Sequence, residues 1–151
     1  MPGGLKVYMR QPQGYEVKGQ ERLVCALDKS IYGLKQAPRI WYLLMNEFLS
    51  SLGFERCKHG YCLYVKRVGD GPDDWIIVVV YVDDLTIMSK NLSMINELKK
   101  ELSQRFQMKD LGDINYILKM EVTRNHNNKT LQISQRKYIK DLLKKYDMTV
   151  F

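Results

Sequence analysis

A strand–Asp-Asp–strand pattern at the centre of the chain constrains its fold more than any other feature. An apolar, β-branched run begins at Trp75 and continues through Tyr81 and Val82, and a shorter run of strand character ends at Met88. The first run is too short to cross a bilayer and has the length of a buried strand. Two strands around a short polar segment predict a hairpin with adjacent acids, Asp83-Asp84, at its tip.

These adjacent carboxylates allow two interpretations. Neighbouring carboxylates repel each other and are stable in water or beside a cation. The pair is therefore either a solvated turn or a divalent-metal site of hard oxygen ligands, of the kind that holds Mg²⁺ beside nucleotide phosphates. Asp73 and Asp74 provide an internal comparison: they follow Gly-Asp-Gly-Pro rather than a strand, and we interpret them as plain loop.

Composition favours a soluble, intracellular domain. The chain has 151 residues, 45% hydrophobic and 27% charged, as expected for one globular domain or part of one. Its cysteines, Cys25, Cys57 and Cys62, show no disulfide framework and suit a reducing compartment. Cys57, His59 and Cys62 lack a fourth ligand for zinc. We find no signal peptide or transmembrane pattern and expect no membrane partner.

Positive charge is concentrated near the end of the chain. Residues 119–145 contain eight basic and two acidic residues, and so carry six of the seven net positive charges. Such a surface favours a polyanionic partner, although a solvated helix face also carries lysines.

The apolar patterns predict elements in roughly the order β, α, β, β, α, β, β, α, in which the central hairpin counts once. Besides the central hairpin, we expect strands at residues 22–27, 62–65, 116–122 and 130–133. One helix begins near Pro38 and ends at Gly53, and another follows Ser89 or Asn91. The last begins near Ser134. The apolar stripe of the second helix is Leu92, Ile95, Leu98, Leu102 and Phe106. Hairpins mixed with helices indicate an α+β sheet with helices on one face.

Several segments together resemble the reverse transcriptase of copia-type (Pseudoviridae) retrotransposons. The most specific is the block SIYGLKQAPRIWY at residues 30–42, followed by the YVDD motif at residues 81–84. The similarity continues through residues 7–15, 108–112 and 116–122, and covers the chain from about residue 7 to residue 148.

The resemblance implies a single partial reverse transcriptase domain over residues 1–151. Its fold would be a palm-like antiparallel sheet with helices on one face, with fingers and palm at about 7–122 and the start of the thumb at about 130–151. In the family, another metal-binding Asp lies on a strand upstream of residue 7, so we expect the chain alone to be inactive. The family has Gly where this chain has Lys119, so we expect an altered primer hairpin at 116–122.

The resemblance also assigns roles to individual residues. Asp83 and Asp84 would be catalytic and would ligate two Mg²⁺ ions, with Mn²⁺ as a substitute; the ions would support attack of the primer hydroxyl on the triphosphate. Nucleotide or template contacts would come from Tyr32, Gly33, Lys35, Gln36, Pro38, Arg39, Tyr81 and Val82. Primer or duplex contacts would come from Met120, Glu121, Lys137, Lys140 and Lys144.

The implied partners are an RNA or DNA template, a DNA primer and deoxynucleoside triphosphates. The chain would belong to a retrotransposon polyprotein, with integrase upstream and RNase H downstream, in a cytoplasmic particle or the nucleus. Two alternatives stay open: a catalytically dead remnant that only binds nucleic acid, and an α+β interaction domain in which the Asp pair is only a turn.

Overall fold

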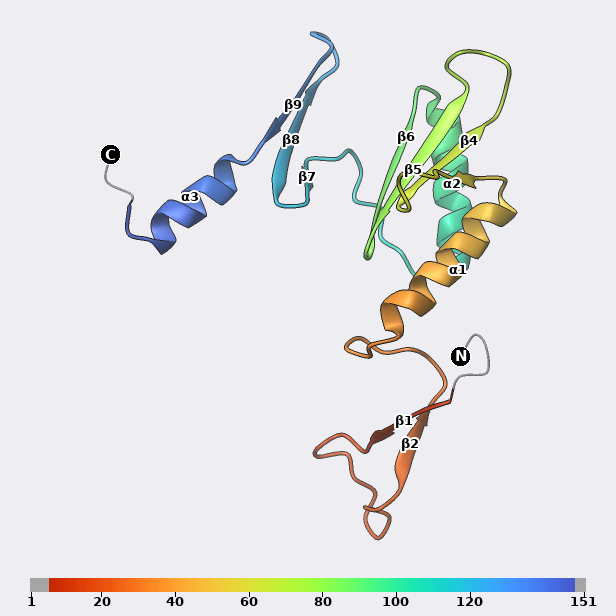
Figure 1. Cartoon of the computed structure of the whole chain (residues 1–151), viewed down its shortest axis with the longest axis vertical. Helices are drawn as coiled ribbons and strands as arrows, with labels where there is room; N and C mark the ends of the chain where they lie inside the picture. The colour runs from red at the N-terminus through yellow and green to blue at the C-terminus, as the bar shows by residue number, and fades with distance from the viewer. Residues whose placement is uncertain (1–5, 149–151) are drawn as a thin grey trace. The chain divides into compact units, whose positions relative to one another are not determined.

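The structure is a computed structural model that describes residues 6–148. Over this range it contains three α-helices and antiparallel strands in three separate sheets, which confirms the α+β class (Figure 1). The strands do not join into the one sheet expected from sequence. The chain divides into two compact units, Met1–Lys90 and Asn91–Phe151.

A four-stranded antiparallel sheet is the main structure of the first unit. Its strands follow one another in sequence order: β3 (Glu55–Arg56), β4 (Leu63–Arg67), β5 (Trp75–Tyr81) and β6 (Asp84–Ser89). The central hairpin is confirmed, since β5 pairs with β6 from Ile76↔Ser89 to Tyr81↔Asp84. Two-residue β3 is too short to leave a periodic pattern and was not predicted.

Helix α1 (Ala37–Ser51) packs with this sheet. Pro38 lies in its first turn, and Gly53 follows its end with a φ of +83°, a conformation that glycine adopts without strain, so both predicted boundaries are confirmed. Tyr64 on β4 donates a hydrogen bond to Asn46 Oδ1 at 3.1 Å. The buried apolar residues of this unit are Met45, Leu49, Phe54, Tyr64, Ile76 and Val78.

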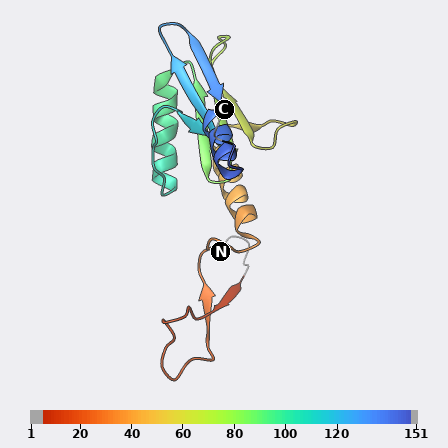
Figure 2. The ribbon, with the colours of Figure 1, turned by 90° about the vertical axis from the view of Figure 1, so that its left-hand side faces the viewer.

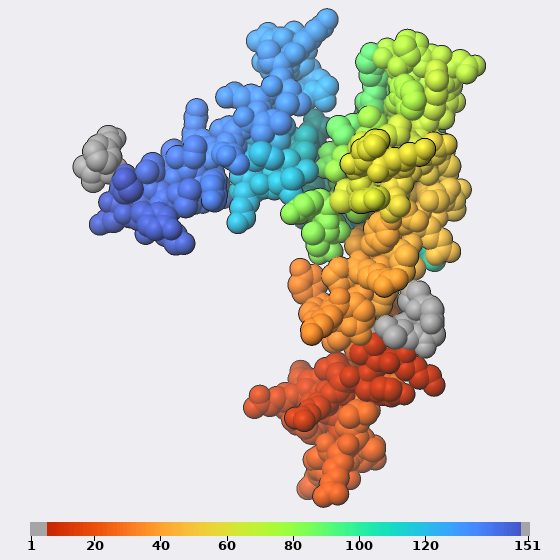
Figure 3. Space-filling view, in the orientation of Figure 1, coloured from red at the N-terminus to blue at the C-terminus, as the bar shows by residue number. Residues whose placement is uncertain are grey.

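The first unit also contains a separate two-stranded hairpin. Strands β1 (Val7–Arg10) and β2 (Val24–Leu27) pair in antiparallel register. No residue from 6 to 36 is buried, and the side chains of this hairpin form the red-to-orange surface in Figure 3.

The second unit begins with helix α2 (Leu92–Arg105). The Asn91 side chain caps it by accepting a hydrogen bond from the Ser93 N–H at 2.9 Å, as predicted. Leu98 and Leu102 are buried, but Leu92 is 68% exposed, so its assignment to the apolar stripe was wrong. Leu92 is the first residue of α2, so its side chain lies beyond the part of the helix whose apolar face is covered.

Three strands and a helix complete the second unit. They are β7 (Tyr116–Ile117), β8 (Met120–Asn125), β9 (Thr130–Ser134) and α3 (Arg136–Lys145). Strands β8 and β9 lie side by side in both views (Figures 1 and 2). The pattern-based prediction of one strand over residues 116–122 was wrong, because a two-residue turn divides it into a β7–β8 hairpin. None of the helices between residues 6 and 148 is both long and apolar enough to cross a membrane.

Candidate functional site

The candidate site is the two-residue turn that joins β5 to β6. Tyr81 ends β5 and Asp84 begins β6, and these two residues pair with each other. Val82 and Asp83 form the turn between them. All four side chains are exposed. The structure therefore places both carboxylates at the solvent-facing end of a hairpin, where a ligand can reach them.

The backbone of this turn is strained at one residue. Val82 has a φ of +53°, which β-branched residues rarely adopt, and no such value occurs at Asp83. A positive φ at the first of two turn positions is the pattern of a type II′ turn, which matches the twist of a hairpin and favours glycine there. The chain thus keeps valine where local preference would place glycine.

A side chain from α1 contacts this strained turn. The Nε1–H of Trp41, in the second turn of α1, donates a hydrogen bond to the carbonyl oxygen of Val82 at 2.7 Å. The contact joins residues 41 positions apart and also brings the start of α1 next to the YVDD turn. No local sequence pattern predicts this contact, because its two residues lie far apart in the chain.

The donors of the turn fit part of a magnesium site. Carboxylate oxygens are the hard ligands that Mg²⁺ prefers, and Asp83 and Asp84 are accessible. Within residues 6–148, however, no three acidic, histidine or cysteine side chains lie close enough together to hold a metal ion. A complete site would need further ligands.

The predicted nucleotide-binding residues lie in the loop before α1 and in its first turn. Tyr32 is 92% exposed, and Gly33 has a φ of +95°, so the loop turns at the position expected from sequence. The Gln36 side chain makes no capping hydrogen bond although it occupies the N-cap. Lys35, Pro38 and Arg39 are exposed, and N–H groups at the start of a helix favour anionic ligands.

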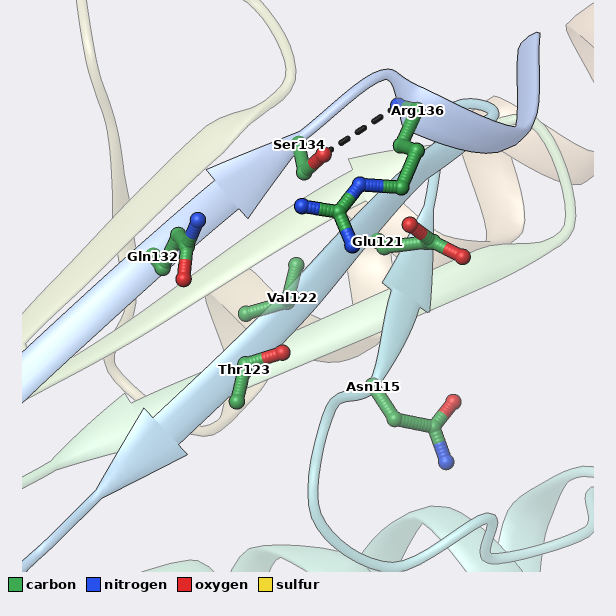
Figure 4. A pocket seen from close by; sticks show the side chains of 7 residues that line it. All are labelled: Asn115, Glu121, Val122, Thr123, Gln132, Ser134 and Arg136. Carbon is green, nitrogen blue, oxygen red and sulfur yellow. Dashed lines mark hydrogen bonds between the residues drawn. The ribbon is translucent and has the colours of Figure 1, made fainter. Parts of the chain in front are cut away.

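A polar pocket lies in the second unit, between the β7–β9 sheet and the start of α3 (Figure 4). Its volume is about 360 Å³. Figure 4 shows the Arg136 guanidinium and the Glu121 carboxylate at the same end of the pocket, and Ser134 Oγ accepts a hydrogen bond from the Arg136 N–H at 3.1 Å. Of the residues that line the pocket, only Glu121 was among the predicted site residues. The other lining residues are Asn115, Val122, Thr123, Gln132, Ser134 and Arg136.

Helix α3 presents a basic face. Lys137, Lys140 and Lys144 follow one another at helical spacing, and all three are exposed. The helix buries none of its residues. The structure therefore leaves these cations accessible to a polyanion.

An exposed Asp-Asp turn between antiparallel strands, in an α+β chain with a basic helix, defines a candidate metal-dependent, nucleic-acid-associated protein. The profile of a family described as "Reverse transcriptase (RNA-dependent DNA polymerase)" matches residues 4–151. The chain belongs to this family, as the sequence resemblance indicated.

Curated relatives agree with this assignment. The chain is 42% identical over 143 residues to the "Retrovirus-related Pol polyprotein from transposon TNT 1-94" of Nicotiana tabacum, covering 95% of the chain and 11% of that protein. It is 38% identical to the corresponding protein from transposon RE1 of Arabidopsis thaliana, covering 94% and 9%.

A shorter yeast relative also matches. The "Putative transposon Ty5-1 protein YCL074W" of Saccharomyces cerevisiae is 31% identical, covering 96% of the chain and 46% of that protein. The chain thus spans about a tenth of the length of the plant polyproteins and about half of the yeast protein. No solved structure matches the chain.

Proposed function

We propose that this chain contributes the metal-binding hairpin and part of the nucleic-acid surface of a retrotransposon RNA-directed DNA polymerase. The observation that carries the proposal is the exposed Asp83–Asp84 pair at the β5–β6 turn of a chain that belongs to the reverse transcriptase family. In this proposal the β3–β6 sheet is part of a polymerase palm, β7–β8 is the primer hairpin, and α3 opens the thumb.

Asp83 and Asp84 would hold two Mg²⁺ ions, or Mn²⁺ in their place, together with ligands supplied elsewhere in the polyprotein. Bound divalent ions lower the pKa of an attacking hydroxyl and stabilise charge on a leaving phosphate. Asp83 lies on the turn itself and Asp84 is the first residue of a strand. Because Asp84 is paired within the β5–β6 ladder and Asp83 is not, the two carboxylates are not equivalent, so we assign the principal ligand to Asp83 and a supporting role to Asp84.

The remaining residues would bind and orient the substrates. The residues that would contact the template base and the deoxynucleoside triphosphate are Tyr32, Gly33, Lys35, Gln36, Pro38 and Arg39, together with Tyr81 and Val82. Met120 and Glu121 on β8 would contact the DNA primer, and Lys137, Lys140 and Lys144 would contact duplex phosphates. Integrase and RNase H would be neighbouring parts of the same polyprotein.

Primer extension by the full-length element tests this proposal. The assay uses primed RNA, deoxynucleotides and Mg²⁺, and compares Asp83→Asn with Asp73→Asn. Asp73 lies in the β4–β5 loop, away from the turn, and pairs with Lys90, which follows β6. We expect Asp83→Asn to lower the rate by about 10²-fold or more and Asp73→Asn to leave it near wild type. Full activity of Asp83→Asn would refute the metal-binding role.

A second function, nucleic-acid binding without catalysis, is favoured by the accessible basic face of α3 and by the absence of a three-ligand cluster within residues 6–148. The same assay distinguishes the two functions. A non-catalytic protein would bind primer–template duplex but would extend no primer, even with wild-type Asp83. For the 151-residue chain by itself we expect binding without extension under either function.

A further inference from the structure

The turn that carries Asp83 does not have the conformation that its own sequence prefers. Valine at a φ of +53° is disfavoured by roughly ten- to a hundredfold relative to an unstrained conformation. Val82 is also 60% exposed, so burial of its side chain is not what holds the backbone in place. An interaction from outside the turn is needed to keep this conformation populated.

The hydrogen bond from Trp41 acts on the peptide group next to Asp83. The carbonyl oxygen that accepts from Trp41 Nε1 at 2.7 Å belongs to the peptide unit joining Val82 to Asp83. Because a peptide unit is planar, fixing its oxygen also fixes the direction of the Asp83 nitrogen and Cα. The orientation of this oxygen therefore restricts where the Asp83 carboxylate can point.

Trp41 is itself held on a rigid support. Met45 and Leu49, one and two turns further along α1, are buried. Asn46 accepts a hydrogen bond from Tyr64 of β4, and Tyr42 accepts one from Arg56 of β3. The helix is thus anchored to the same sheet whose β5–β6 hairpin carries the turn, which allows the indole to hold a defined position.

We propose that Trp41 is a positioning residue, which holds the strained Val82–Asp83 peptide so that the Asp83 carboxylate is presented in one orientation. The role of Asp83 as a metal ligand rests on the proposed function. The hydrogen bond and the positive φ do not depend on it.

A double-mutant cycle in the full-length element tests the proposal. Trp41→Phe keeps an aromatic ring and removes the donor, while Val82→Gly removes the cost of the positive φ. We expect Trp41→Phe to lower kcat by about tenfold, the upper range for one hydrogen bond, with little change in KM for deoxynucleotides and a higher Mg²⁺ requirement. In the Val82→Gly background, Trp41→Phe should lower kcat by a clearly smaller factor.

Trp75→Phe is the matched control, since Trp75 begins β5 and its ring stacks on Arg67 with the guanidinium carbon 5.2 Å from the ring centroid. It makes the same chemical change at the opposite end of the strand. Values of kcat are referred to active sites counted by burst titration, so a loss of folded protein alone leaves them unchanged. The proposal would be overturned if Trp41→Phe and Trp75→Phe lowered kcat equally. It would also be overturned if Trp41→Phe lowered kcat by the same factor in the Val82→Gly background as in the wild type.

Hydrogen exchange of the 151-residue chain provides a readout independent of polymerisation. The chain has two tryptophans, so its two indole N–H signals in a ¹⁵N–¹H spectrum can be assigned with the two Phe variants. We expect the Trp41 indole to exchange at least about tenfold more slowly than in unfolded chain, and unprotected exchange would overturn the proposal. If Asp83→Asn were fully active, the proposed function would fail. If Asp83→Asn were inactive but Trp41→Phe matched Trp75→Phe, only the positioning role would fail.

Discussion

Lys137 Nζ lies 5.6 Å from the centroid of the Tyr116 ring and so connects α3 to β7. A cation over an aromatic face is stabilised by about 0.5–1 kcal/mol at an exposed site. The family resemblance implies that Lys137 contacts duplex, and the structure gives this side chain an intramolecular contact. Its replacement would change folding and binding together, so a clean test of phosphate contact uses other lysines of α3.

Replacing Lys140 and Lys144 by Glu, which reverses their charge, should weaken the binding of primer–template duplex by the 151-residue chain. If these exposed lysines neutralise phosphates, the slope of log affinity against log salt should become shallower by about one for each lysine. Fluorescence anisotropy over a range of salt concentrations measures both quantities.

In the matched control, Lys58 and Lys100 are replaced by Glu. This makes the same change in net charge at exposed positions outside α3. This control should retain the wild-type slope. An equal loss in both double variants would indicate a general charge effect rather than contact by α3.

Replacement of Lys119 by Gly should stabilise the chain. The β7–β8 turn keeps positive φ values of +51° at Leu118 and +64° at Lys119, the pattern of a type I′ turn that favours glycine at its second position. Relief of this strain, less the greater freedom of glycine in the unfolded chain, should raise the free energy of unfolding by about 1 kcal/mol. Urea denaturation measures the change.

Lys109→Gly is the control for this substitution, because Lys109 lies in a loop and has no positive φ. It should destabilise by about 0.5 kcal/mol through the unfolded state. If Lys119→Gly destabilised the chain in the same way as Lys109→Gly, strain at the β7–β8 turn would not be significant.

Asp110 should make stability depend on pH in the acidic range. The Gly112 N–H donates to its carboxylate at 2.9 Å and Lys99 lies 3.0 Å away, and these contacts lower the pKa of Asp110 from 3.8, the Gly112 bond most. Because the pKa of Asp110 is lower in the folded state than in the unfolded state, the ionised carboxylate stabilises the folded state. The stabilisation is therefore present above pH 3.8 and is lost as pH falls through the lower folded value.

Urea denaturation of wild type and Asp110→Asn at several pH values measures this effect. The difference in unfolding free energy should be constant near neutrality and shrink below pH 3.8. Lys99→Met should leave most of the pH dependence, because the Gly112 bond remains. A difference that is independent of pH would contradict the role of Asp110.

Local patterns predicted the parts of the fold that are set locally. The β-branched run and its two acids predicted the β5–β6 hairpin, and Pro38 and Gly53 predicted the limits of α1. The turn at Leu118 and Lys119 was missed by pattern because neither residue favours a positive φ; the family resemblance indicated a hairpin there.

The parts that could not be predicted depend on residues distant in sequence. The Trp41–Val82 hydrogen bond spans 41 positions, and hydrophobic periodicity reports only which helix face is covered. The same limit applies to the pocket, where Thr123 and Gln132 come together only because β8 and β9 pair in that register.

The central claim is that the β5–β6 turn is a polymerase metal site in which Asp83 is the principal ligand. The most direct measurement compares Asp83→Asn with Asp84→Asn by primer extension in the full-length element, with Mg²⁺ and with Mn²⁺. We predict a loss of about 10²-fold or more for Asp83→Asn, and a smaller loss for Asp84→Asn that Mn²⁺ partly restores. Near wild-type extension by Asp83→Asn, with or without activity of Asp84→Asn, would contradict the claim.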